Sequence, residues 1–254
     1  MIYVLGLFLI ALFLLDLQLG SISISLGEIL AHLRGRNELS DQQLMILTKF
    51  RLPRIATALM AGAALPACGL QMQTLFRNPL AGPYVLGISS GASFGAALVV
   101  LGAGATGIVA TWSLALAAWI GAGTVMLLLL FVSHRIKDVM TILILGIMFS
   151  SGLAAIISIM QYFSEASALK SFVIWSMGSL GNVTGAQLQI MVWAILPLLL
   201  ITLAYSKVLN GLMLGEEYAQ TMGVRVQRTR LIIFATTSIL AGTITAFCGP
   251  IGFI

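Results

Sequence analysis

A stretch of five residues, Gly87-Ile88-Ser89-Ser90-Gly91, matches the Gly-x-Ser-x-Gly pattern that presents a nucleophilic serine in hydrolases. Such a serine works only with a strand before it, a helix after it, and a histidine and an acid within reach. Here a proline-containing turn precedes the stretch, and the two histidines, His32 and His134, fall in segments expected to be loops. A hydrolase is therefore not favoured.

The sequence also gives little support for a metal site, an ATP-binding site or a proton relay. Cys68 and Cys248 lie in apolar stretches without histidine or cysteine neighbours at ligand spacing, so we expect two buried core residues and predict no metal site and no cofactor. The Gly-x4-Gly-Lys-Ser/Thr motif does not occur, so any ATP must be bound by a separate subunit. Asp16 is the only acid well inside an apolar run; a proton relay is one interpretation, and solvation by headgroup water near the end of the run is the favoured one.

Two polar segments suggest contacts rather than catalysis. Arg51-Leu52-Pro53-Arg54 opens a predicted helix, and its arginines either anchor that helix at the membrane interface or present planar donors to carboxylates of a partner. The segment from Arg77 to Pro83 contains two prolines and a glycine, which forbid a continuous helix. Irregular backbone at membrane depth must be buried or line a water-filled cavity, so a gate and a plain tight turn both remain open.

The segment from Leu214 to Gly223 is predicted to be a short amphipathic helix that ends at a glycine. Its apolar residues Leu214, Tyr218 and Met222 recur every four positions. Such a helix lies on lipid or packs into a groove of a soluble partner. Glu216 and Glu217 favour a protein partner, because anionic headgroups would repel them.

The elements that must position these segments are membrane helices. Hydrophobic residues make up 59% of the 254 residues and charged residues only 8%, with a mean hydropathy of +1.07. A water-soluble domain has roughly 25% charged residues. The formal net charge of +5 is spread over short polar segments, so no nucleic-acid partner is predicted. The predicted fold class is all-α, a polytopic transmembrane helix bundle that contacts membrane lipid.

Seven segments approach the roughly 20 apolar residues that a spanning helix needs. Pro66 is expected to bend the second, and the two GxxxG steps from Gly87 to Gly95 are expected to admit a close neighbouring helix. Basic residues do not orient the chain, because Arg34 to Arg54 puts an unusual positive charge on the expected outer side. The segments are Ile2–Leu19, Ile55–Leu75, Val85–Leu101, Val109–Val132, Val139–Tyr162, Leu188–Tyr205 and Leu231–Phe247.

Several ordered motifs together resemble the FecCD-type permeases, the membrane subunits of bacterial ABC importers for ferric siderophores, haem and vitamin B12. The resemblance covers nearly the whole chain. The motifs are RLPR at 51–54, GAAL at 62–65, Gly69 with Gln73, RNPLA at 77–81, LG at 86–87, GA at 91–92, the tryptophan and GSL of 175–180, and LGEEYAQTMG at 214–223.

The resemblance implies a permease subunit of an ATP-binding-cassette importer that translocates an iron chelate or corrinoid across the bacterial cytoplasmic (inner) membrane. It implies no enzyme activity in this chain, because partner subunits hydrolyse the ATP. The implied partners are a second permease subunit, identical or paralogous, two ATP-binding subunits, and a periplasmic or lipoprotein substrate-binding protein. The transport path is expected to run between the two permease subunits.

The resemblance also assigns roles to residues of this sequence. Arg51 and Arg54 are expected to dock glutamates of the substrate-binding protein, which would account for the outer positive charge. The cytoplasmic gate and path are expected at Asn78, Pro79, Leu80, Met140 and Thr141. Coupling to the ATPase is expected at Leu214, Gly215, Glu216, Glu217, Ala219 and Gly223.

Residues 1–254 are predicted to form a single transmembrane permease domain that is incomplete at its C-terminus, because the family pattern continues past Ile254 through about three of about ten helices. The alternative is a secondary transporter driven by an ion gradient, which normally has ionisable residues at mid-membrane depth. Asp16 is the only charged residue that lies well inside a predicted apolar segment. A membrane-embedded enzyme would need paired acids or histidines inside the spans, and the sequence has none there.

Overall fold

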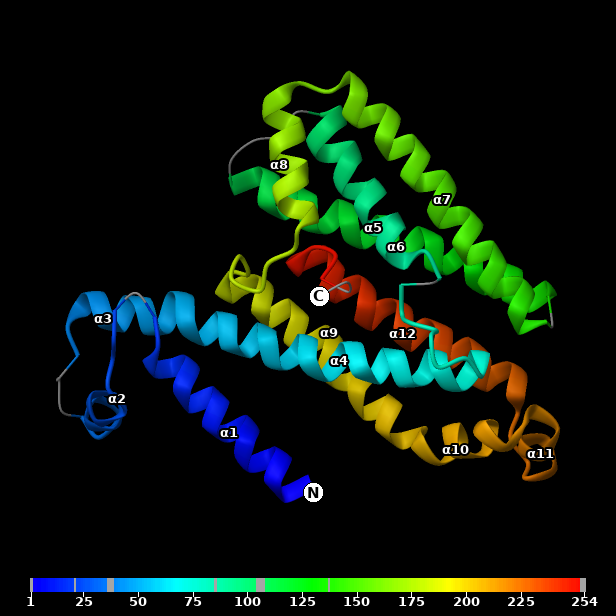
Figure 1. Cartoon of the computed structure of the whole chain (residues 1–254), viewed down its shortest axis with the longest axis horizontal. Coiled ribbons are helices and arrows are strands. Elements are labelled where there is room, and N and C mark those ends of the chain that lie inside the picture. Colours follow the sequence, from blue (N-terminus) through cyan, green and yellow to red (C-terminus); the bar gives the residue numbers. More distant parts are fainter. Residues whose placement is uncertain are drawn as a thin grey trace. The chain divides into compact units, whose positions relative to one another are not determined.

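The computed structural model describes residues 2–20, 22–35, 39–84, 86–103, 108–136 and 138–251, and every regular element in these ranges is helical (Figure 1). This confirms the predicted all-α class. The elements are α1 (Ile2–Gln18), α2 (Leu26–Leu33), α3 (Asp41–Ile46), the π-helical segment η1 (Leu47–Arg51), α4 (Leu52–Phe76), α5 (Ile88–Ala97), the π-helical segment η2 (Leu98–Gly102), α6 (Ile108–Arg135), α7 (Val139–Phe163), α8 (Ala166–Ser176), α9 (Gly185–Ala204), α10 (Ser206–Leu214), α11 (Glu216–Thr221) and α12 (Val226–Cys248).

Each of the seven predicted apolar segments contains a helix; for the third, the predicted start at Val85 lies outside the described residues, and the helix begins at Ile88. Within the described ranges, five helices are long and apolar enough to cross a membrane, and two apolar helices, Tyr3–Gln18 and Ile88–Gly102, are shorter. The spans near the C-terminus lie close to their predicted bounds. The second span does not: it is part of one continuous helix from Asp41 to Phe76, so the predicted start near Ile55 was wrong.

The early start of this long helix has a local cause. Ser40 and Gln43 form a capping box, in which the Gln43 side-chain oxygen accepts from the Ser40 backbone N–H at 2.9 Å and the Ser40 hydroxyl accepts from the Gln43 N–H at 3.3 Å. This pairing satisfies two of the free N–H groups of the first turn. The helix also continues through Pro66, although that residue cannot donate a backbone hydrogen bond.

The chain divides into two compact units, which are described separately. The first comprises residues 1–59 and 180–189. Its apolar core joins α1 to the loop after it and to the start of the long helix, and the buried members are Leu17, Ile24, Leu39, Leu47 and Ile55. The prediction of one permease domain over 1–254 stays a prediction.

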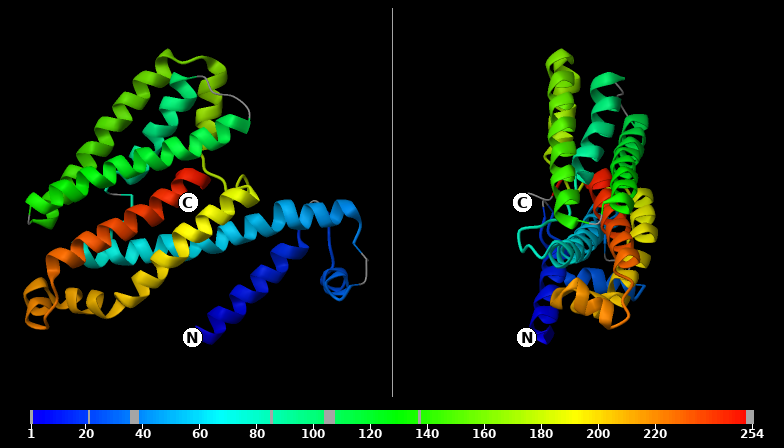
Figure 2. Two further views of the ribbon diagram at one scale, coloured as in Figure 1. Left: turned by 180° about the vertical axis from the view of Figure 1, so that it is seen from behind. Right: turned by 90° about the vertical axis from the view of Figure 1, so that its right-hand side faces the viewer.

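The second unit comprises residues 60–179 and 190–254 and is organised around α5, α6, α7 and α12 (Figures 1 and 2). Small residues bring α5 against α6: a Cβ on Gly91 would lie 2.6 Å from the carbonyl oxygen of Gly121, and a Cβ on Gly95 would collide with the Ala117 carbonyl. The predicted role of the GxxxG steps in close helix packing is therefore confirmed for Gly91 and Gly95.

A buried polar network links three helices of the second unit. The Gln71 amide on α4 donates to the Thr202 hydroxyl on α9 at 2.7 Å. Its oxygen accepts from the hydroxyls of Thr237 at 2.6 Å and Thr236 at 3.1 Å on α12. All four side chains are buried, so the network satisfies polar groups that would otherwise be unpaired in the apolar interior. Sequence analysis did not single out Gln71.

Candidate functional site: a charged cleft beside the coupling segment

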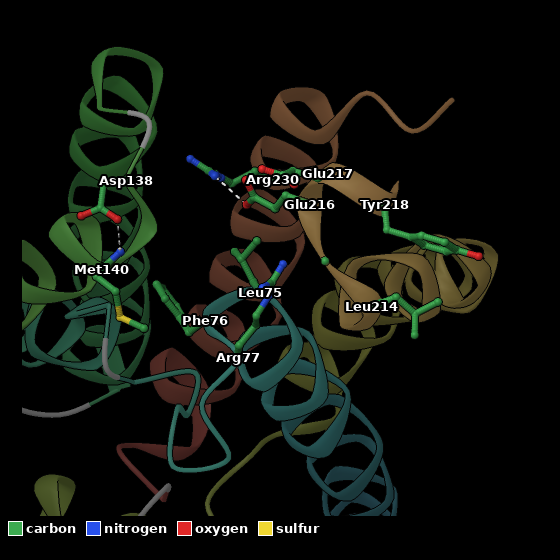
Figure 3. Close-up of a pocket in the computed structure, with 11 residues that line it drawn as sticks. Leu75, Phe76, Arg77, Asp138, Met140, Leu214, Glu216, Glu217, Tyr218 and Arg230 are labelled. Atoms are coloured by element: carbon green, nitrogen blue, oxygen red, sulfur yellow. Dashed lines mark hydrogen bonds and ion pairs between the residues drawn. The ribbon is translucent and has the colours of Figure 1, made fainter. Parts of the chain in front are cut away.

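A cleft of about 710 Å³ lies in the second unit where the ends of several helices meet. Figure 3 shows Asp138 and Met140 on one side and the residues of α10 and α11 on the other, with the end of α4 between them. The cleft is thus lined both by Met140, a predicted gate residue, and by Leu214 to Glu217, which belong to the predicted coupling residues. The lining residues are Leu75, Phe76, Arg77, Asp138, Met140, Leu214, Gly215, Glu216, Glu217, Tyr218 and Arg230.

The predicted gate loop leaves α4 at this cleft. The helix ends at Phe76, whose ring packs against Phe234 of α12 with centroids 6.2 Å apart. Arg77 then adopts a positive φ of 47°, and the Asn78 side chain accepts a hydrogen bond of 2.9 Å from the Leu80 backbone N–H. The predicted irregular backbone is confirmed. Asn78, Pro79 and Leu80 do not line the cleft, and Leu80 is 87% exposed.

The coupling segment is not the single helix predicted for Leu214 to Gly223. Leu214 ends α10, Gly215 has a φ of 131°, and α11 begins at Glu216. Residues with a Cβ rarely adopt that φ, so the glycine breaks the helix where periodicity alone predicted continuity. The predicted glycine at the C-terminal end is confirmed: Gly223 has a φ of 83°, and the Val224 N–H donates to the Ala219 carbonyl at 3.0 Å.

The predicted apolar stripe of this segment is exposed. Leu214, Tyr218 and Met222 each have more than half of their surface accessible, whereas Ala219 is completely buried beneath them. In Figure 3 the Tyr218 ring points away from the side of the cleft that carries Asp138. The segment therefore presents an apolar surface with Glu217 exposed at its edge.

An ion pair ties α11 to α12. The Arg230 guanidinium lies 2.8 Å from a carboxylate oxygen of Glu216 (Figure 3), and Arg230 is only 5% exposed. The Glu216 side chain is 37% exposed, so only Arg230 is buried, and removing Glu216 would leave the Arg230 charge unpaired with little water around it. Sequence analysis missed Arg230, since no local spacing relates it to Glu216.

Asp138 fixes the start of α7, where Met140 and Thr141 lie. Its carboxylate accepts from the Met140 N–H at 3.3 Å, the Thr141 N–H at 3.0 Å and the Thr141 hydroxyl at 2.6 Å. The hydrogen bonds from Thr141 lower the pKa of Asp138 below its usual value, and the positive charge of Arg230 adds a smaller effect. The cleft thus holds a fixed pattern of charge around the predicted gate.

The two predicted docking arginines have different surroundings in the first unit. Arg51 is 8% exposed, and its guanidinium donates to the carbonyls of Leu17 at 2.6 Å and Gln18 at 3.2 Å and to that of Ile22. Arg54 is exposed. Arg51 therefore closes the loop after α1, and its docking role stays a prediction.

The remaining residues singled out in the sequence form no catalytic group. Asp16 is exposed in the last turn of α1. Ser89 lies in the first turn of α5, and no strand precedes it in the described residues. The prediction that both histidines are in loops was wrong, because His32 lies in α2 and His134 in α6. The predicted burial of Cys68 and Cys248 is confirmed.

Comparison with known proteins decides the family. The profile of the FecCD transport family matches residues 8–254. The chain belongs to the FecCD transport family. It is therefore related to membrane permeases, in agreement with its apolar helices, and is a multi-pass membrane protein.

Relatives and solved structures place the FecCD chain among transport proteins. It is 35% identical to the hemin transport system permease HmuU of Yersinia pestis, over 85% of this chain and 65% of the relative. It is 36% identical to the vitamin B12 import system permease BtuC of Klebsiella pneumoniae, over 85% of this chain and 64% of the relative. A structure of an inward-facing metal-chelate type ABC transporter superposes with a TM-score of 0.86 at 29% identity, over 98% of this chain and 76% of that chain.

The matched region spans about two thirds of the length of the two permeases, 65% of HmuU and 64% of BtuC. Within that span the family match includes all the predicted gate, docking and coupling residues, since they lie between Arg51 and Gly223.

Proposed function

We propose that this chain is the permease subunit of an ATP-driven importer that moves an iron chelate, such as a siderophore or haem, or a corrinoid across the bacterial cytoplasmic membrane. The observation that supports this proposal best is the exposed apolar stripe formed by Leu214, Tyr218 and Met222. Helix α11, which carries part of this stripe, is joined to α12 by the ion pair between Glu216 and the buried Arg230. A surface that is both exposed and rigidly connected to a spanning helix is suited to receive force from a partner. The family membership supports the same role.

The coupling step follows from the contacts around the cleft. Two ATP-binding subunits bind the exposed stripe, and their closure on ATP displaces α11. The Glu216–Arg230 ion pair passes that displacement to α12, which also packs against α4 through Phe234 and Phe76. Movement at the cleft changes the position of Met140 and Thr141 and of the loop that begins at Arg77. This chain performs no covalent chemistry, and its partners hydrolyse the ATP.

The gate and docking assignments belong to the same proposal. Leu80 is a large apolar side chain with 87% exposure beside the irregular loop, which supports contact with a second permease subunit across the path. Arg54 is exposed and free to meet a carboxylate of the substrate-binding protein. Arg51 supports that surface by holding the preceding loop against the helix.

The ion-gradient alternative is not favoured. An ion-coupled carrier uses ionisable groups within the bilayer. Asp16 lies exposed in the last turn of α1, and Arg230 is already paired with Glu216 near the first turn of α12.

Reconstitution tests the proposal. The intact permease, with its ATP-binding and substrate-binding subunits, is placed in vesicles and offered haem, vitamin B12 or a ferric siderophore with and without enclosed ATP. We expect uptake of one of these compounds only with ATP. Uptake that continues without ATP and follows an imposed proton or sodium gradient would contradict the proposal and support a secondary transporter.

A further inference from the structure

The end of α4 is closed by a hydrogen-bond pattern that ordinarily goes with glycine. The Arg77 N–H donates to the Thr74 carbonyl at 3.4 Å, and the Asn78 N–H donates to the Gln73 carbonyl at 3.2 Å. These two bonds, with a left-handed residue at the first position after the helix cap, form the Schellman motif that ends many helices. The left-handed residue is Arg77, whose φ is 47°. An arginine therefore occupies the position that glycine fills without strain.

The arginine costs conformational free energy at this position. In the left-handed region a Cβ crowds the neighbouring backbone, so residues other than glycine seldom adopt it. In the described part of the chain, Arg77 is the one such residue with a positive φ. The left-handed residues after α8, α11 and α12 are all glycines, namely Gly178, Gly223 and Gly249. A strained residue in this setting points to a use for its side chain.

The Arg77 side chain reaches the coupling segment. A Cβ built on Gly215 would lie 3.4 Å from the Nη2 atom of Arg77, which is ordinary van der Waals contact. Figure 3 shows this side chain extending from the end of α4 toward the backbone between Leu214 and Glu216. Gly215 is the residue that separates α10 from α11. Because it has no side chain, the guanidinium lies directly against the backbone at the break.

This contact joins two parts of the site that the ion pair does not connect. Glu216 and Arg230 link α11 to α12. The backbone of Arg77, in contrast, leads directly into the predicted gate loop, where the Asn78 side chain accepts from the Leu80 N–H. One residue therefore touches the predicted ATPase-contact segment with its side chain and begins the predicted gate loop with its backbone.

We infer that Arg77 is a positioning residue that transmits the displacement of α11 to the gate loop. The inference rests on the proposed importer function and adds a second route of coupling beside the ion pair. When an ATP-binding subunit moves α11, the backbone at Gly215 pushes the guanidinium. The Arg77 backbone, already in a sparsely populated conformation, then rotates and carries Asn78 to Leu80 with it.

The experiment measures how many ATP molecules are hydrolysed for each molecule imported. It uses vesicles that contain the intact permease with its ATP-binding and substrate-binding subunits. The probe is whichever of vitamin B12, haem or a ferric siderophore the wild type imports with ATP. Arg77→Gly removes the side chain and the strain together. Arg77→Gln removes the guanidinium and keeps a residue with a Cβ at this position.

The matched control is Arg228→Gln. Arg228 is an exposed arginine of α12 that does not line the cleft, so this variant loses the same charge away from the contact with Gly215. Thermal unfolding in detergent accompanies each variant. Arg77→Gly should unfold within a few degrees of the wild type, because relief of the left-handed strain offsets the greater flexibility of its unfolded chain.

Both Arg77 variants should hydrolyse ATP at close to the wild-type rate, since the exposed surface of α11 is intact. They should consume about tenfold more ATP for each molecule imported, because the movement of α11 reaches the gate loop less effectively. Arg228→Gln should match the wild type in both measurements. A residue with a purely structural role would lower hydrolysis and uptake in proportion and leave their ratio unchanged.

An unchanged ratio in the Arg77 variants would overturn the inference and leave the importer function intact. Failure of both variants to fold would also overturn it, because Arg77 would then serve stability. ATP-independent uptake by the wild type, driven by an ion gradient, would instead remove the proposed function, and this inference would fall with it.

Discussion

Two adjacent glutamates in α11 have the same side chain and different surroundings. Glu216 pairs with the buried Arg230, whereas Glu217 is exposed at the edge of the apolar stripe. An exposed acid can be reserved for a partner, while a paired acid holds the segment in place. The two positions therefore separate a structural role from a docking role within one turn of helix.

Replacing Glu216 with Gln should destabilise the protein, because Arg230 keeps its charge with little water around it. A loss of about 2 kcal/mol is expected, below the cost for a pair in which both members are buried. The melting temperature in detergent measures it. Glu217→Gln is the matched control and should leave the melting temperature within a degree or so. Equal melting temperatures for the two variants would contradict the importance of the ion pair.

The two arginines of RLPR provide a second comparison at this scale. Arg51→Met should lower the melting temperature, because three carbonyls around Leu17 and Ile22 lose their donor, at a cost of about 3 kcal/mol. Arg54→Glu should fold normally and weaken binding of the substrate-binding protein about tenfold at low salt, measured by pull-down. If Arg54→Glu bound that protein as tightly as the wild type, the docking role of Arg54 would be wrong.

At the scale of elements, the contact of α5 with α6 depends on the absence of side chains. The backbone of α5 at Gly91 lies directly against that of α6 at Gly121. Helices in lipid gain no hydrophobic drive for association, so such close backbone contact is a main source of their packing energy.

Gly91→Ala should therefore push the two helices apart and destabilise the protein by about 1 to 3 kcal/mol. Gly123→Ala, on α6 with open space around its Cβ, is the control and should be neutral or slightly stabilising, since alanine favours helix. Thermal unfolding of the two variants in the same detergent makes the comparison. A Gly91→Ala variant as stable as Gly123→Ala would refute the close-packing role.

Local patterns predicted the elements well where one strong signal dominated. Apolar length located the spans, and the prolines and glycine after Phe76 predicted the irregular loop. The start of the long helix at Asp41 was missed, although the Ser40 to Gln43 capping box was visible in the sequence. The break at Gly215 was missed because a four-residue apolar period continues across it.

Local sequence patterns could not predict which side chains pair with one another at and around the candidate site. Arg230 meets Glu216, and Gln71 meets Thr202, Thr236 and Thr237, across separations that no sequence period encodes. Arg51 was recognised as important, yet its burial against backbone carbonyls depends on how the loop after α1 folds back. The positions of helices and turns were therefore predictable from the sequence, whereas the long-range side-chain contacts were not.

At the scale of the whole molecule, several spans retain large uncovered apolar surfaces. On α7, for example, Ile144, Ile147, Met148 and Ile159 are exposed. Lipid or a second permease subunit covers such surfaces in a membrane protein. The exposed Leu80 beside the gate loop is the position whose contact with a second subunit is most directly testable.

Leu80→Cys in the intact permease should form an intersubunit disulfide under mild oxidation if the path runs between two copies. The product is read as a dimer band on a non-reducing gel, and reductant should return it to monomer. The parent protein is the control, because its own Cys68 and Cys248 are buried and should not crosslink. A monomer band alone after oxidation of the Leu80→Cys protein in membranes would contradict this arrangement of the path.

The Gln71 network sets a limit on how such a permease can rearrange. The Gln71 amide forms hydrogen bonds with three hydroxyls on two other helices, so sliding α4 along α9 or α12 would leave several polar groups unpaired in the apolar interior at once. These three helices should consequently move together as one rigid body during each transport cycle. The hinges and sliding contacts must then be found among their neighbours.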